Sequence, residues 1–186
     1  MIDRDPKQVL EWLKSGNADF RGRVWANDPR REHLIRGQRP RAAVLGCADS
    51  RVAPEIAFGA ALGELFVVRV AGGVANRASV ASLEYAVSVL GVGLVVVFAH
   101  QGCGAVEAAL QSLEGSRNLD HLLDFIVPAI EACESRDVDD VARVNARLNA
   151  DRLTVESGLL RRAVEQGDLQ IATAFFNFET GEVEFD

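Results

Sequence analysis

The pattern of hydrophobic positions changes near residue 41. Over residues 6–35, apolar and charged positions alternate at roughly helical spacing, which predicts one or two amphipathic helices that cover a partner surface. From Arg41 onward, short apolar runs alternate with helical stretches. We therefore expect an N-terminal helical arm over residues 1–37 and a single α/β domain over residues 38–186.

Three apolar runs in the second part have the length of buried strands, at 42–46, 65–70 and 93–99. Helices are predicted from Pro54, over 78–90 with Asn76 or Ser79 as its cap, and over 104–114, 118–135, 137–149 and 152–166. The residues 169–178 and 183–185, joined by a turn at Thr180 and Gly181, indicate a C-terminal hairpin. Strands that alternate with helices are typical of a mainly parallel central sheet flanked by helices.

Two short segments carry the candidate chemistry. Cys47 follows the first apolar run, and His100 follows the third, with Cys103 three residues later. Ligands collect at the carboxyl ends of parallel strands, so these segments meet at one edge if their strands are neighbours. Two thiols and an imidazole suit a catalytic zinc with an open fourth position. The spacing also leaves open a structural zinc site, or a packed pair of cysteines without a metal.

A carboxylate and a guanidinium accompany the first candidate ligand. Asp49 stands two residues after Cys47, where it could orient a nucleophile on the metal. Left alone, this carboxylate could also close the open position as a fourth ligand. Arg51 could hold it away through a bidentate pair. Gly104 directly follows Cys103 and allows backbone N–H groups to approach the thiolate or an anion.

Composition excludes several other classes of function. The 186 residues carry a net charge of −7 with scattered basic positions, so we expect no nucleic-acid partner. No apolar run approaches the ~20 residues of a membrane span, and the start shows no secretory signal. The 3 cysteines without an export signal favour reduced thiols and a cytoplasmic location.

The paired motifs resemble the β-class carbonic anhydrases. The resemblance lies in Cys-Ala-Asp-Ser-Arg-Val at 47–52, followed by His-x-x-Cys-Gly at 100–104. It extends to Gly-Glu-Leu-Phe-Val-Val-Arg at 63–69, Ser-Leu-Glu-Tyr-Ala-Val at 82–87 and the ending at 177–183. It therefore covers the chain from about residue 38 to the C-terminus.

The resemblance implies a Zn²⁺ cofactor and a reaction. Cys47, His100 and Cys103 become the zinc ligands, with water or, in a closed state, Asp49 as the fourth. Asp49 and Arg51 become the catalytic pair. The implied reaction is the reversible hydration of carbon dioxide to bicarbonate and a proton by zinc-bound hydroxide. The alternatives are hydrolysis of carbonyl sulfide or carbon disulfide at the same site, or a non-catalytic zinc module, which an intact Asp49–Arg51 pair disfavours.

The resemblance also implies a substrate pocket and an assembly. Gln38, Phe66 and Tyr85 occupy the positions that line the pocket in the plant-type branch, and Gly104 is expected beside the substrate. Taken without the resemblance, the first three are a polar loop residue, a core aromatic and a helix-surface tyrosine. The family uses an N-terminal arm to clasp a neighbouring subunit, so we expect a homodimer or a higher homo-oligomer.

Overall fold

The computed structural model describes residues 5–113 and 115–186, so residues 1–4 of the predicted arm and position 114 lie outside the described residues. The chain divides into two compact units, one up to Gln38 and one from Arg39 onward. The first unit contains α1 (Pro6–Asp19), a turn of π-helix, a turn of 3₁₀-helix and α2 (Arg31–Arg36). Asp5 caps the start of α1, and its carboxylate accepts hydrogen bonds from two N–H groups of the first turn. Trp12 on this helix is 71% exposed.

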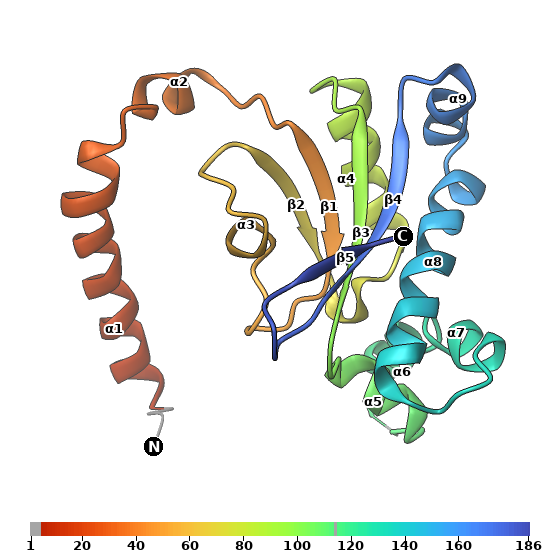
Figure 1. The fold of residues 1–186 in the computed structure, drawn as a ribbon. Helices are drawn as coiled ribbons and strands as arrows, with labels where there is room; N and C mark the ends of the chain where they lie inside the picture. The colour runs from red at the N-terminus through yellow and green to blue at the C-terminus, as the bar shows by residue number, and fades with distance from the viewer. Residues whose placement is uncertain (1–4, 114) are drawn as a thin grey trace. The chain divides into compact units, whose positions relative to one another are not determined.

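The second unit is built on a five-stranded sheet with the order β2-β1-β3-β4-β5 (Figure 1). Its strands are β1 (Ala42–Gly46), β2 (Leu65–Arg69), β3 (Leu94–His100), β4 (Gln170–Phe176) and β5 (Val183–Phe185). The first four strands in the sheet order are parallel, and β5 pairs with β4 in the antiparallel direction. The predicted fold class, including the C-terminal hairpin, is confirmed.

Helices cover both faces of this sheet. Successive residues of β3 point to opposite faces, so Val95 and Val97 pack in one hydrophobic cluster and Val96 and Phe98 in another. The first cluster includes residues of α4 (Arg77–Ser88), α8 (Val138–Glu156) and α9 (Gly158–Gln166), and the second includes residues beside α3 (Pro54–Ala57). A third cluster lies under the carboxyl end of the strands and is formed by α5 (Gly104–Leu110), α6 (Arg117–Leu123), α7 (Val127–Ala132) and α8.

Helix boundaries differ from the sequence expectation in several places. The helix predicted over 104–114 is shorter in the structure, where α5 ends at Leu110. The helix predicted over 118–135 is divided into α6 and α7, and Pro128 stands in the first turn of α7, where its missing N–H is not needed. The break predicted near residue 150 is wrong, because α8 continues to Glu156. The boundary falls instead at Ser157, whose hydroxyl accepts the N–H of Leu160 at the start of α9.

The predicted starts of two other helices are confirmed. Asn76 caps α4, and Ser79 completes a reciprocal capping box with it. Helix α3 begins at Pro54, as predicted. Among the described residues, no helix is both long enough and apolar enough to cross a membrane.

Candidate metal centre and active site

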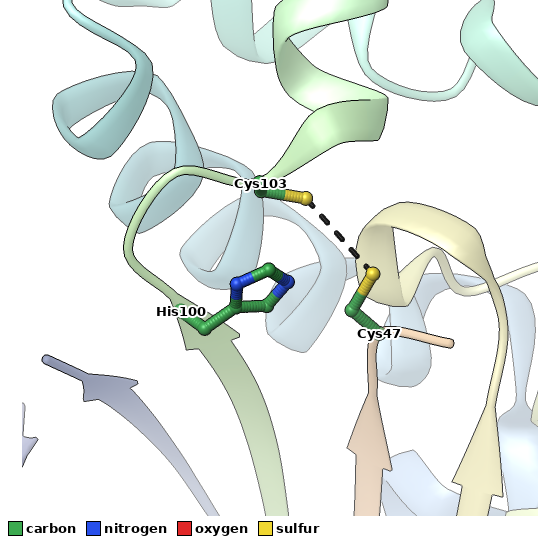
Figure 2. A group of neighbouring side chains, drawn as sticks. All are labelled: Cys47, His100 and Cys103. Atoms are coloured by element: carbon green, nitrogen blue, oxygen red, sulfur yellow. Dashed lines mark hydrogen bonds between the residues drawn. The ribbon is translucent and has the colours of Figure 1, made fainter. Parts of the chain in front are cut away.

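The sheet brings both candidate ligand segments to one edge. Strands β1 and β3 are neighbours, and Gly46 pairs with Phe98, so Cys47 and His100 emerge side by side. Cys103 occupies the N-cap position of α5. Figure 2 shows the imidazole and the two sulfurs turned toward one another. All three residues are buried, their ligand atoms lie within 4.8 Å of one another, and the two sulfurs are 4.0 Å apart.

These donors fit a zinc ion. His100 Nδ1 lies 2.9 Å from the carbonyl oxygen of Gln101, so Nδ1 carries the proton and Nε2 presents its lone pair. Within the described part of the chain, Nε2 is buried without a hydrogen-bond partner, which is unfavourable unless another acceptor of that lone pair is bound. Two thiolates on a tetrahedral zinc are about 3.8 Å apart, close to the separation seen between Cys47 and Cys103.

Hydrogen bonds favour the thiolate form of Cys47. The contact with Cys103 lowers the pKa of the Cys47 thiol and raises the pKa of the Cys103 thiol, so Cys47 is the more acidic of the two. The N–H groups of Gly72 and Asp49 donate to the Cys47 sulfur at 3.2 and 3.4 Å. Burial lowers the pKa of His100, but the nearby Cys47 sulfur and the Gln101 carbonyl outweigh it and raise the pKa overall. A cluster of this polarity attracts a cation.

Asp49 and Arg51 form a bidentate ion pair beside these ligands. Arg51 Nε and Nη2 donate to the two carboxylate oxygens at 3.0 and 2.7 Å, and the Arg51 N–H adds a third bond at 2.9 Å. The arginine hydrogen bond lowers the pKa of Asp49 to about 2. Asp49 Oδ2 is 4.0 Å from His100 Nε2, so the carboxylate stands next to the ligand cluster. The guanidinium also lies 4.7 Å from the ring centre of Phe178.

Arg69 holds the loop that carries Cys47 and Asp49. Its guanidinium donates to the carbonyl oxygens of Cys47, Asp49 and Val52 at 2.9, 2.6 and 2.9 Å. This role of Arg69 was not predicted from the sequence. The only available signal was a single cation at the end of an apolar strand, and its register with Gly46 was needed to place it.

Two buried asparagines of α8 support the Gly72 turn, and they too were missed. Asn145 donates to the Gly72 carbonyl at 2.8 Å, and Asn149 accepts the N–H of Ala75 at 2.6 Å. The two side chains also bond to each other, at 2.9 Å, and are only 3% and 2% exposed. The available signal was a pair of amides four residues apart on an otherwise apolar face of the helix, which indicates that the two side chains have buried hydrogen-bond partners.

Of the predicted pocket residues in this unit, Phe66 and Tyr85 form a pair of their own and Gly104 directly follows Cys103. Phe66 and Tyr85 contact each other with ring centres 6.2 Å apart, and Tyr85 is 46% exposed. Phe66 pairs with Ala43, four residues before Cys47, which is about 13 Å at the usual rise of a strand. Gly104 is exposed at the start of α5, with open space where a side chain would project.

Gln38 is the last residue of the N-terminal unit and is exposed. Its predicted role in the substrate pocket stays a prediction.

Comparisons with known proteins agree with this architecture. A family model described as carbonic anhydrase matches residues 42–183. Carbonic anhydrase of Mycolicibacterium smegmatis is 37% identical over 200 residues, covering 99% of this chain and 95% of that protein. Carbonic anhydrase 2 of Mycobacterium tuberculosis is 47% identical over 117 residues, covering 61% of this chain and 56% of that protein.

A solved structure shows the same fold at lower identity. A tetrameric β-carbonic anhydrase of the filamentous ascomycete Sordaria macrospora superposes with a TM-score of 0.84 at 23% identity, over 96% of each chain.

The match over most of the chain, joined to the Cys-His-Cys cluster, defines an enzyme of the carbonic anhydrase family. The chain belongs to the β class of that family, as the resemblance of its motifs indicated. The general reaction of the family is the interconversion of carbon dioxide and bicarbonate.

Proposed function

We propose that this chain is a zinc-dependent catalyst of the reversible hydration of carbon dioxide to bicarbonate and a proton. The observation that carries the proposal is the Asp49–Arg51 pair, with Asp49 Oδ2 4.0 Å from His100 Nε2. A structural zinc site needs no carboxylate held beside it by an arginine, whereas a catalytic site needs a group that orients the nucleophile.

Cys47, His100 and Cys103 would hold the zinc ion. When bound there, zinc acidifies a coordinated water and so supplies the nucleophile near neutral pH. Thiolates oppose this acidification because they neutralise the charge of the metal. The N–H groups of Gly72 and Asp49 withdraw part of the charge of the Cys47 sulfur, which offsets some of that loss.

Asp49 acts as a hydrogen-bond acceptor that orients the nucleophile. Because its pKa is lowered to about 2, the carboxylate is ionised near neutral pH. Arg51 keeps both carboxylate oxygens engaged and so prevents Asp49 from taking the open position on the metal. Without that ion pair, the Asp49 carboxylate would be free to serve as a fourth donor to the metal, which would close the site.

The substrate pocket is completed by a second copy of the chain. Phe66 is too far along the sheet to reach the metal site of its own chain, and Tyr85 on α4 contacts it, but β2 is an edge strand and Tyr85 is exposed. Together with Gln38 they would form an apolar wall and a hydrogen-bond donor for a substrate oxygen, next to the N–H groups at Gly104.

The protein would therefore be a homodimer or a higher homo-oligomer. The exposed apolar side chains of α1, such as Trp12, support this assembly because they offer a surface for a neighbouring copy. The solved relative from Sordaria macrospora is itself tetrameric. We also propose a cytoplasmic location, which the three free cysteines support.

Metal analysis and two parallel assays test the proposal. The purified protein should contain one zinc per chain and hydrate carbon dioxide in a stopped-flow assay with a pH indicator. Cys103→Ser should lose both zinc and activity, whereas Cys133→Ser should keep both, because Cys133 lies at the end of α7 outside the cluster. A zinc-loaded wild type that hydrolyses carbonyl sulfide but does not hydrate carbon dioxide would refute the proposed reaction.

A further inference from the structure

Gly102 is held from both sides in the loop between two candidate zinc ligands. Its N–H donates to Asp139 Oδ1 at 2.7 Å, and its carbonyl oxygen accepts Arg51 Nη2 at 2.9 Å. The residue has a φ of +57°, in the left-handed region that glycine adopts readily. A glycine in an exposed loop has many alternative conformations, so these two bonds select the observed one.

Asp139 is itself in a fixed position. It lies in the first turn of α8, and its N–H donates to the capping carboxylate of Asp137 at 2.9 Å. Helix α8 packs against β3, the strand that ends at His100, and against its neighbour β4. The carboxylate of Asp139 is therefore carried by a rigid element, and its short bond to a backbone N–H is charge-assisted.

We propose that Asp139 is a positioning residue for the active site. Through Gly102 it fixes the loop from His100 to Cys103, and it also fixes the carbonyl that engages Arg51. Since the same Nη2 atom of Arg51 bonds both Gly102 and Asp49, the chain Asp139–Gly102–Arg51–Asp49 links the start of α8 to the carboxylate beside the metal ligands. This role rests on the proposed function of Asp49 and Arg51.

A simpler role is that Asp139 only favours the start of its helix. Acidic residues in the first turn stabilise a helix through its dipole, and Asp140 shares that position. In the part of the chain that the structure describes, the Asp140 side chain makes no hydrogen bond or ion pair, and it is exposed. Asp140→Ala therefore removes the same charge from the same turn without touching Gly102, which makes it the matched control.

The test compares Asp139→Ala, Asp139→Asn and Asp140→Ala in the full-length, zinc-loaded enzyme. Three quantities are measured: kcat and KM for carbon dioxide hydration, the rate of zinc loss to a chelator, and hydrogen exchange of the Gly102 amide by NMR. Supporting groups around metal ligands typically contribute about 10-fold to 100-fold in activity or affinity. We expect Asp139→Ala to lower kcat about tenfold with little change in KM, and to accelerate both zinc loss and Gly102 exchange.

The conservative variant and the control separate the outcomes. Asp139→Asn keeps an oxygen that can accept the Gly102 N–H, so it should restore most of kcat, and Asp140→Ala should match the wild type. If Asp139→Ala behaves like Asp140→Ala in all three measurements, the positioning role is wrong while the proposed function stands. If the wild type itself binds no zinc or does not hydrate carbon dioxide, the proposed function fails whatever the Asp139 variants do.

Discussion

A methyl group at position 72 should disturb the metal centre through a single side chain. Gly72 has a φ of +73°, and a Cβ built there would lie 2.9 Å from Ile126 Cδ1. Ile126 is fully buried in the cluster under the ligand edge. Gly91 has the same φ of +73° but nothing within 4 Å of its Cβ position, so Gly91→Ala isolates the backbone contribution.

The expected magnitudes follow from these contacts. A left-handed conformation costs an alanine about 1–2 kcal/mol, and both variants bear this cost. Overpacking of a dense core costs about 1–3 kcal/mol more, and only Gly72→Ala bears it. We therefore expect Gly72→Ala to lower the free energy of unfolding by about 2–5 kcal/mol and Gly91→Ala by about 1–2 kcal/mol.

A double-mutant cycle with Ile126→Val measures the clash directly. Valine lacks the Cδ1 atom, so Ile126→Val should cost about 0.5–1.5 kcal/mol in the wild type but relieve the strain in Gly72→Ala. The free energy of unfolding is measured by urea titration at one protein and zinc concentration, because assembly and metal binding both shift apparent stability.

Gly72→Ala should also weaken the hold on the metal. The Gly72 N–H bonds the Cys47 sulfur, so Gly72→Ala should also release zinc to a chelator faster than Gly91→Ala does. Equal destabilisation by the two alanine variants, or an Ile126→Val effect that is simply additive with Gly72→Ala, would refute the proposed clash.

Three further predictions concern the active site. Arg51→Ala should move the acid limb of the pH profile of kcat/KM to higher pH, because the released Asp49 carboxylate competes for the open metal position. In the wild type, where Arg51 lowers the pKa of Asp49 to about 2, proton uptake by Asp49 does not produce that limb: the ion-pair stabilisation is fully present above about pH 4 and is lost only as the pH falls toward 2. An acid limb that does not move would contradict the competition. Arg69→Met removes three hydrogen bonds to loop carbonyls. It should lower the free energy of unfolding, measured by urea titration, by about 1–3 kcal/mol and should speed zinc loss to a chelator. An unchanged rate of zinc loss would mean that the loop keeps its conformation without Arg69. Gln38→Ala should raise the activation free energy of carbon dioxide hydration by about 1–3 kcal/mol, seen as a lower kcat/KM in the stopped-flow assay. An unchanged kcat/KM would remove Gln38 from the mechanism.

Sequence alone predicted the parts of the site that depend on residue type and strand order. Two thiols and an imidazole are side chains that zinc prefers as ligands, and both segments follow strongly apolar strands. Once β1 and β3 are neighbours in a parallel sheet, Cys47 and His100 must meet at one edge. The helix boundary near residue 150 was mispredicted because Asn149, Ala150 and Asp151 look like a polar turn, although Asn149 is buried inside α8.

The parts that sequence did not predict all act on the backbone. Arg69 and Asp139 bond backbone groups of the two ligand loops, and Asn145 bonds the carbonyl of Gly72 in the neighbouring turn. A backbone group gives no sequence signal of its own. Their roles depend on strand register and on the rotation of α8, both of which require the folded chain. The buried face of α8 carries polar side chains where a purely structural helix would carry apolar ones. Such departures from an apolar core are expected near functional sites. The hydrogen bond from a buried amide to the backbone beside a candidate metal ligand is therefore better evidence for a supporting role than the position of that amide in the helical sequence pattern.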